Sequence, residues 1–374
     1  MEDKLLGGLT ARDFLRRHWQ KRPLLVRRAI APRSPVTRIS LALLAALAAR
    51  DDVESRLVRG SGRRWQLQPG PLTRARLARM PRRGWTLLVQ GVNHHVQAAE
   101  QLLRRFAFIP QARLDDVMAS HAAPGGGVGP HWDSYDVFLV QAQGRRVWRV
   151  SRPRRYAELQ GAPLRIIDGF EAEDEYLLDP GDLLYLPPGW GHEGVALERS
   201  ITLSVGFRAP SAEELGAAFF DHLADRGLPR GSYRDPDLRQ AVRPAEIGSG
   251  MLRRMRAMLE RVRWTRGEVD EFLGLYLATP KPHLRFARPV RPLARRAFAR
   301  RLAAATLVLD PKTLLLYRGG RFFVNGESPQ VAPALRGALR ELADRRSAPG
   351  RRFASAPALA LLHEWYRAGY IHLR

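Results

Sequence analysis

The sequence predicts a mixed α+β protein with an N-terminal jelly-roll barrel (a double-stranded β-helix) and a mainly helical C-terminal half. Short apolar runs separated by glycine and proline turns recur over the first 210 residues, as in a jelly roll. Beyond that point capped helical segments predominate. We therefore divide the 374 residues into a barrel domain at 1–210, a helical region at 211–285 and a winged-helix-like domain at 286–374.

The N-terminal elements follow from local signals. Thr10 can cap a helix that ends near Trp19, where Lys-Arg-Pro precedes an apolar strand. Ser40 opens a second helix of leucines and alanines. Strand-like runs follow at 56–59, 64–68 and 85–92, then a helix at 97–105 and a run from 114 to 120.

The segment Pro-Gly-Gly-Gly-Val-Gly-Pro-His-Trp-Asp at 124–133 carries the first candidate metal ligands. We expect His131 and Asp133 to lie on one strand, because residues two apart in a strand point to the same face. His192 follows 61 residues after His131, just beyond an apolar strand at 183–186 that ends at two prolines. Two imidazoles and one carboxylate on one side of a metal are typical of non-haem Fe(II) oxygenases, since coordination positions stay open.

Other features of this region have competing interpretations. The three glycines at 125–127 could form a phosphate loop, but no Gly-Lys-Ser/Thr follows, and a tight turn into the metal strand is favoured. His94, His95 and His121 are further candidate ligands. None has a carboxylate two residues away, so we expect them in loops or packed against the barrel.

An arginine is predicted to point into the barrel. The strand after Asp133 is expected to turn at Gly144 and return as a hairpin partner over 145–150. On that strand Arg146 shares a face with Trp148 and Val150, so its buried charge needs a partner. A carboxylate ligand matches the guanidinium fork, and a buried structural ion pair is the alternative.

The second half of the chain reads as helices and a small α+β unit. Ser211-Ala-Glu-Glu predicts a capping box on a helix to about 226, and two more helices are expected at 245–264 and 269–277. This region could form a dimerisation module or a cap on the barrel. A basic helix, a strand at 306–309, a hairpin at 314–325 and helices at 331–345 and 356–368 complete the winged-helix-like unit.

Charge and composition limit the functional classes. The chain has 62 basic and 37 acidic residues, a net charge of +25, yet residues 111–210 carry 14 acidic and 10 basic residues. The overall excess suggests a polyanion such as nucleic acid, or simply arginine-rich composition, whereas an acidic barrel rim suits a cationic substrate. The absence of cysteine excludes thiolate metal sites. We find no signal sequence or membrane span and expect a soluble cytoplasmic protein.

Several motifs together resemble a known family. His-x-Asp with Tyr-Asp-Val-Phe, Gly-Arg-Arg-x-Trp-Arg-Val, Pro-Gly-Asp-x-Leu-Tyr-x-Pro-Pro-Gly-x-x-His-Glu-Gly and Ser-Val-Gly-Phe-Arg-Ala-Pro are similar to the JmjC ribosomal oxygenases. Within that family they resemble specifically the bacterial arginine 3-hydroxylases that act on large-subunit ribosomal protein sixteen. The resemblance also includes segments 13–23, 55–58 and 87–94; it is close over the first 210 residues and loose beyond them.

The resemblance implies an Fe(II)- and 2-oxoglutarate-dependent dioxygenase that hydroxylates C-3 of an arginine in a ribosomal protein. His131, Asp133 and His192 would bind the metal, and Arg146 with Ser120 would bind 2-oxoglutarate. A homodimer through the helical region is implied, with the C-terminal domain as a scaffold or substrate platform. Apart from the resemblance, we keep nucleic acid as a possible partner of the basic chain but do not favour it.

The sequence leaves the reaction type, the orientation of two side chains and the overall function undecided. The motif does not distinguish hydroxylation from demethylation. Thr202 and Ser204 are second-line site residues whose face, inward or outward, the alternation leaves undecided. The alternative function is a cupin-type ligand sensor with a DNA-binding C-terminal domain.

Overall fold

The computed structural model describes residues 4–240 and 242–374, which form two units. The first comprises the chain up to Ala209 with Pro280–Thr313 and Ala332–Arg374. The second comprises Pro210–Thr279 and Leu314–Val331. Among the described residues, no helix is both long and apolar enough to span a membrane.

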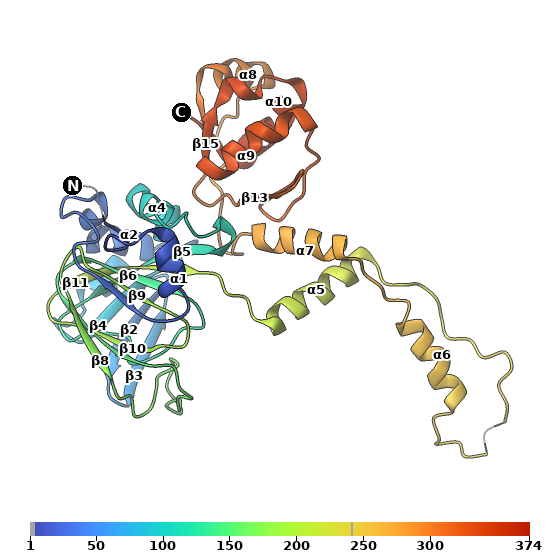
Figure 1. The fold of residues 1–374 in the computed structure, drawn as a ribbon, viewed down its shortest axis with the longest axis horizontal. Helices are drawn as coiled ribbons and strands as arrows, with labels where there is room; N and C mark the ends of the chain where they lie inside the picture. Colours follow the sequence, from blue (N-terminus) through green and yellow to red (C-terminus); the bar gives the residue numbers. More distant parts are fainter. Residues whose placement is uncertain (1–3, 241) are drawn as a thin grey trace. The chain divides into compact units, whose positions relative to one another are not determined.

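Two antiparallel sheets form the barrel of the first unit (Figure 1). The larger has the order β1-β9-β6-β11-β5-β4-β2-β3, and the smaller has the order β10-β7-β8. Apolar residues of both sheets pack together between them, among them Leu139, Leu184, Trp148 and Val150. The larger sheet contains β1 (Leu24–Val26), β2 (Ser55–Ser61), β3 (Arg64–Pro69), β4 (Trp85–Val89), β5 (Leu114–Ala122), β6 (Val137–Gln143), β9 (Leu183–Leu186) and β11 (Ser200–Phe207), and the smaller contains β7 (Arg146–Ser151), β8 (Asp174–Leu178) and β10 (Gly191–Ala196).

The outer face of the large sheet carries the main hydrophobic core. On β11, Leu203 and Val205 belong to this core, which also includes Phe14 and Phe138. Helices α1 (Ala11–Arg17), α2 (Leu41–Ala48) and α4 (Gln97–Arg104) supply residues to the same core (Figure 1). Thr10 and Ser40 cap the first two helices as predicted, each accepting a hydrogen bond from a backbone N–H in the first turn.

The predicted hairpin at Gly144 is wrong. Strand β6 pairs with β9 and β11 in the large sheet, whereas β7 pairs with β8 and β10 in the small one. Gly144 has φ +61°, and its α-carbon faces the Arg199 carbonyl so closely that a Cβ would lie 2.2 Å from that oxygen. The chain therefore crosses from one sheet to the other at this glycine, because barrel closure provides each strand with a more distant partner.

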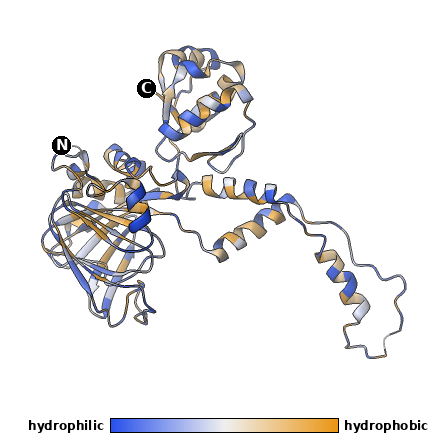
Figure 2. Cartoon of the chain, in the orientation of Figure 1, coloured by the Kyte–Doolittle hydropathy of each residue, from blue (hydrophilic) through white to orange (hydrophobic). Residues whose placement is uncertain are grey.

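The second unit is helical with one hairpin. It contains α5 (Ala212–Arg226), α6 (Ser249–Leu259) and α7 (Arg266–Ala278), and β13 (Leu315–Arg318) pairs with β14 (Arg321–Val324). Hydrophobic residues recur along α5 and α7 (Figure 2). Ser211 caps α5 by accepting a hydrogen bond from the Glu214 N–H, while the complete capping box is at Thr265 and Glu268.

The rest of the C-terminal chain belongs to the first unit. Here β12 lies between β15 and β16. The predicted helix at 356–368 has those bounds, whereas the helix predicted at 331–345 begins with a 3-10 turn. The elements are α8 (Arg295–Ala304), β12 (Thr306–Leu309), α9 (Arg336–Arg345), β15 (Ser347–Pro349), α10 (Ala356–Ala368) and β16 (Ile371–Leu373); elsewhere a short helix α3 (Arg74–Ala78) follows β3.

Candidate metal centre

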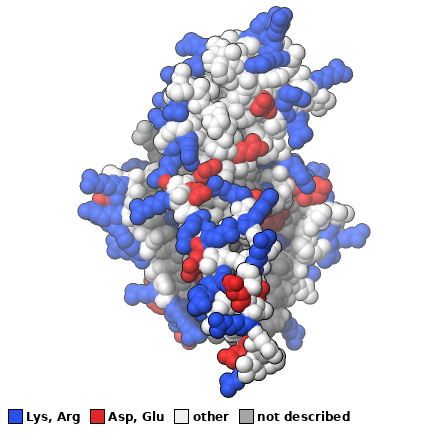
Figure 3. All heavy atoms as spheres, turned by 90° about the vertical axis from the view of Figure 1, so that its right-hand side faces the viewer, with Lys and Arg blue, Asp and Glu red and all other residues white. Residues whose placement is uncertain are grey.

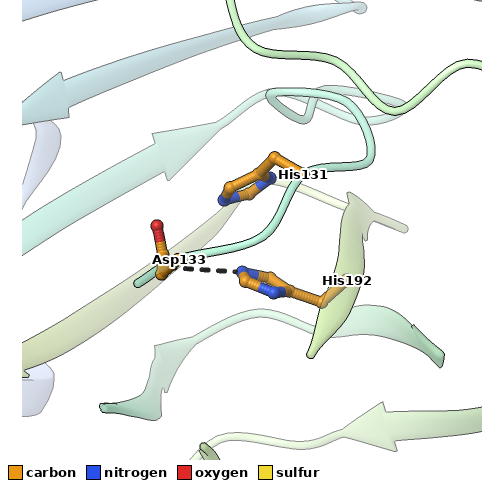
Figure 4. A group of neighbouring side chains, drawn as sticks. All are labelled: His131, Asp133 and His192. Atoms are coloured by element: carbon orange, nitrogen blue, oxygen red, sulfur yellow. Dashed lines mark ion pairs between the residues drawn. The ribbon is translucent and has the colours of Figure 1, made fainter. Parts of the chain in front are cut away.

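The side chains of His131, Asp133 and His192 point toward one another (Figure 4). His131, Asp133 and His192 each offer one ligand atom, and these atoms lie within 4.8 Å of one another. His192 Nε2 is 3.7 Å from Asp133 Oδ2, and the two imidazole centroids are 4.3 Å apart. The structure thus brings together the three residues that the sequence singled out, in the donor set typical of a facial triad.

The reason they converge differs from the prediction. His131 and Asp133 do not lie on a continuous strand: His131 forms an isolated bridge with His192, and Asp133 lies in an irregular segment before β6. The bridge consists of two hydrogen bonds, His131 N–H to His192 O (2.9 Å) and His192 N–H to His131 O (2.7 Å). The Gly189 N–H donates to the Asp133 carbonyl at 2.8 Å, which fixes the third residue.

Hydrogen bonds orient both imidazoles. His131 Nδ1 lies 2.9 Å from the Gly129 carbonyl, and His192 Nδ1 lies 2.9 Å from the Trp190 carbonyl. Because a carbonyl only accepts, each Nδ1 carries the proton and each Nε2 keeps its lone pair. Burial, with a smaller effect of His131, lowers the pKa of His192 to about 4, so His192 is neutral at pH 7. The Nε2 atoms of both imidazoles, left free by the bonds at Nδ1, fit a divalent metal.

Glycine is required where the loop meets the barrel. A Cβ on Gly126 would lie 2.3 Å from the Trp85 carbonyl oxygen, and one on Gly127 would lie 2.6 Å from the Gly194 carbonyl oxygen. These contacts are with backbone atoms and leave no room for a side chain. The glycine run therefore allows the loop to approach β4 and β10, which supports the structural interpretation over a phosphate loop.

The triad lines a cavity of about 490 Å³ inside the barrel. Arg146 and Ser120 line the same cavity, as do the carboxylates of Asp115 and Asp116. Ser204 also lines it, while Leu203 and Val205 belong to the outer core. The face of β11 left undecided by the sequence, with Thr202 and Ser204, is therefore the inward one.

Arg146 is a buried cation whose binding capacity the protein does not fill. Its side chain is 3% exposed, and the predicted parity with Trp148 and Val150 is confirmed because all three are buried. Nη1 donates to Ser120 Oγ (3.1 Å) and Nη2 to Ser200 Oγ (3.2 Å), while Nε has no partner.

No carboxylate among the described residues forms an ion pair with this guanidinium. Burial lowers the pKa of Arg146 to about 10, so the group is still charged at pH 7. The structural ion pair considered as an alternative is thus not seen in the described part of the chain, and a buried charge of this kind calls for an anionic ligand.

The other candidate histidines lie outside the triad. His121 is buried with its ring 5.4 Å from that of Trp85, and burial lowers its pKa to about 4. Burial likewise lowers the pKa of His94 to about 3 and that of His95 to about 4. Packed, neutral side chains agree with the structural roles expected for them.

Two features of the site were not predicted. Ser200, which binds Arg146, has the same strand parity as Thr202 and Ser204, and this alternation could have identified it. Lys281 was also missed, because its partners lie some 165 residues away and no spacing rule reaches them. Its Nζ lies 2.9 Å from Asp115 Oδ2 and 2.8 Å from Asp116 Oδ2.

Gln90 completes the surroundings of this acidic pair. Its side-chain amide donates to both oxygens of Asp116, at 2.9 and 3.0 Å. Burial alone would lower the pKa of Lys281, but the carboxylates of Asp116 and Asp115 raise it above its ordinary value. The ammonium is therefore charged, and it neutralises part of the negative charge of Asp115 and Asp116.

A jelly-roll barrel with this triad and an inward arginine defines the class of the protein as a JmjC-type barrel. The model of the JmjC domain matches residues 101–215, and that of the ROXA-like winged helix matches residues 261–372. The predicted fold class is confirmed.

Comparison with individual proteins is more specific. The chain is 36% identical over 364 residues to the ribosomal protein uL16 3-hydroxylase of Escherichia coli, covering 96% of each chain. It is 36% identical over 236 residues to a probable ribosomal oxygenase of Haemophilus influenzae, covering 62% of this chain and 55% of that protein. The X-ray structure of E. coli YcfD has a TM-score of 0.86 at 35% identity, covering 98% of this chain and 99% of that one.

YcfD, a ribosomal oxygenase, has also been solved in complex with cobalt and 2-oxoglutarate. That structure has a TM-score of 0.81 at 35% identity and covers 98% of this chain and 99% of the other. The chain belongs to the ribosomal oxygenase family, and the resemblance seen in the motifs is confirmed.

The ion pairs of Lys281 with Asp115 and Asp116 should stabilise the fold. Replacing Lys281 by Met leaves Asp115 and the buried Asp116 without their shared cation, which should lower the free energy of unfolding by about 1–3 kcal/mol. Chemical denaturation measures this loss. Lys21→Met, at an exposed position, should change stability little, and the effect of Lys281→Met should shrink in an Asp116→Asn background. Equal losses for both lysines would show that the bridge is unimportant.

Proposed function

We propose that this protein is an Fe(II)- and 2-oxoglutarate-dependent oxygenase that hydroxylates C-3 of an arginine side chain in ribosomal protein uL16. One observation carries the proposal. A triad of two histidines and one aspartate lines the same cavity as Arg146, which is buried and has no carboxylate partner among the described residues. The likeness to the uL16 3-hydroxylase over 96% of both chains supports the same activity and substrate.

The residues fit the metal that this function requires. His131, Asp133 and His192 would hold Fe(II), with both Nε2 atoms available because both Nδ1 atoms are bound to carbonyls. When bound, iron would supply the oxidative chemistry in which 2-oxoglutarate and dioxygen are consumed and one oxygen atom enters a substrate C–H bond. The protein then needs to bind, orient and shield the reactants rather than provide an acid or base.

Arg146 and Ser120 are suited to the carboxylate of 2-oxoglutarate farther from the metal. A guanidinium binds a carboxylate through two parallel N–H bonds, and the buried setting strengthens both. Ser120 contacts Nη1 already and could turn its hydroxyl toward the same carboxylate. Ser200 Oγ accepts a hydrogen bond from Nη2 and so helps to orient the guanidinium group.

The cavity wall is compatible with a cationic substrate side chain. Asp115, Asp116 and Asp133 all line it. Lys281 neutralises part of this charge, so the wall is less acidic than the sequence suggested. Demethylation uses the same triad, and the choice of hydroxylation rests on the relative rather than on the site.

The central test measures succinate formed from 2-oxoglutarate with Fe(II) and ascorbate, with and without uL16 of the same organism. We expect turnover to rise with uL16, and one arginine-containing peptide to gain the mass of one oxygen atom. Residues that hydrogen-bond to metal ligands contribute about 10–100-fold to activity. His131→Ala removes a ligand itself, so its turnover should fall by more than that.

The matched control is His95→Ala, which removes a histidine outside the triad and should keep full turnover. Absence of turnover in iron-loaded protein would favour the ligand-sensor function. Loss of a methyl group in place of oxygen gain would identify a demethylase.

The role of Arg146 can be separated from general charge effects. Arg146→Gln removes two charge-assisted bonds to the co-substrate and should raise the KM for 2-oxoglutarate by about 100-fold. Arg149→Gln is the control, because Arg149 lies on the same strand with an exposed side chain paired to Glu175 and Glu193. A similar KM in both variants would remove Arg146 from the binding site.

We also propose that the chain is organised as 1–210, 211–285 and 286–374, with the helical region forming a homodimer. Several of its large apolar side chains are exposed, including Phe220 (64%) and Leu259 (73%). Surfaces of this kind commonly bind another protein chain.

Sedimentation velocity tests the dimer. Leu259→Glu should convert it to a monomer, because an ionised carboxylate is costly to bury in an apolar interface. Leu197→Glu introduces the same charge at an exposed leucine of the barrel domain and should leave the dimer intact. A wild-type chain that sediments as a monomer at all concentrations would contradict the proposal.

A further inference from the structure

One stretch of the barrel domain is far more basic than its surroundings. Residues 55–84 form β2, β3, α3 and the turn that follows, and they include nine arginines and no aspartate or glutamate. Basic side chains are spread over the face drawn in Figure 3, with acidic ones among them. The segment 55–84 differs because it supplies no carboxylate of its own. Its arginines are Arg56, Arg59, Arg63, Arg64, Arg74, Arg76, Arg79, Arg82 and Arg83.

Four of these arginines line a second cavity, of about 740 Å³, and none of its lining residues is acidic. Arg63 is paired with Asp168, at 2.7 and 3.0 Å. Arg59, Arg64 and Arg83 form no ion pair with any described carboxylate. Three uncompensated guanidinium groups therefore surround one hollow, which we call the arginine cavity.

An aromatic ring lies among these cations. Trp65 lines the arginine cavity from β3 and is only partly buried. Its indole N–H donates to the Gly62 carbonyl at 2.9 Å, which fixes the ring at one edge. Guanidinium groups around a fixed aromatic ring are the combination that single-stranded nucleic acid uses, with phosphates on arginine and bases stacked on the ring.

The arginine cavity adjoins the cavity of the metal centre. Pro163 lines both. Leu67, two residues after Trp65 on β3, lines the metal-centre cavity. Trp65 also packs against the loop that carries His131, since a Cβ on Gly129 would lie 2.8 Å from its ring. A ligand in the arginine cavity would thus lie beside the metal-centre cavity.

We propose that the arginine cavity, formed by Arg59, Arg64, Arg83 and Trp65, binds single-stranded RNA. Arginine forks recognise phosphate oxygens bidentately, and a base stacks on the indole ring. Aspartate and glutamate side chains could satisfy the arginines but have no ring to stack on Trp65, whereas every nucleotide carries both a phosphate and a base, so the ring favours RNA. The link to catalysis rests on the proposed function, because it requires a ribosomal protein substrate that is bound to RNA. Binding of RNA to the arginine cavity does not depend on that function.

The test is direct binding of a fluorescent single-stranded RNA of about 12 nucleotides, followed by anisotropy at several salt concentrations without iron, 2-oxoglutarate or uL16. The variant Arg59→Gln/Arg64→Gln/Arg83→Gln should flatten the slope of log affinity against log salt by about 2, since each phosphate contact contributes about 0.7. Trp65→Ala should weaken binding by about 5- to 100-fold, and Trp65→Phe by less.

The matched control is Arg296→Gln/Arg300→Gln/Arg301→Gln, which removes the same charge from exposed positions of α8. Equal losses in the two triple variants would overturn the proposal, because net charge alone would then explain binding. Preference for a polyglutamate peptide over RNA would also overturn it and point to an acidic protein. Turnover with isolated uL16 should be unchanged in the arginine-cavity variant, so failure of RNA binding and failure of the hydroxylase proposal are distinguishable.

Discussion

Two backbone hydrogen bonds between His131 and His192 hold the site together. They join a loop that follows β5 to the start of β10, 61 residues further along the chain. Each histidine also ties its Nδ1 to the carbonyl two residues before it. A longer ladder would have kept the loop extended, whereas a single bridge leaves it free to bend and bring Asp133 to the same point. The convergence of the three metal ligands therefore depends on strand pairing that is limited to the single bridge between His131 and His192.

Arg146 imposes a second constraint, because a buried cation is costly without a counter-ion. Two serine hydroxyls satisfy part of its hydrogen-bonding capacity but none of its charge. An anion that entered the cavity would offset this cost, which supports the proposed binding of a carboxylate by Arg146. Arg146 on β7 lines the same cavity as His192 on β10 and as His131 and Asp133 in the loop before β6. An acid with two carboxyl groups could meet both requirements at once.

Local rules predicted the residues of the site better than the connections between strands. Alternation placed Arg146, Trp148 and Val150 on the inward face, because parity depends only on the strand that carries them. The hairpin at Gly144 was wrong, since pairing depends on closure of the whole barrel and not on the turn alone. The expected strand through His131 and Asp133 failed for a related reason: glycines and tight backbone contacts at 126–129 override the extended pattern. Lys281 could not be found, as its contact with Asp116 is set by the path of the C-terminal chain.

Charge is separated over a short distance on this barrel. The metal-centre cavity is lined by the carboxylates of Asp115, Asp116 and Asp133 together with Arg56, Arg146 and Arg165, while the adjoining arginine cavity has no acidic lining residue. A surface of uniform sign would attract a ligand without orienting it. The metal-centre cavity thus offers carboxylates as well as cations, whereas the arginine cavity offers cations alone. This difference favours a ligand that is cationic at the reacting side chain and anionic nearby. A basic ribosomal protein bound to RNA has that charge pattern. Pro163, which lines both cavities, marks where the protein and the RNA would meet.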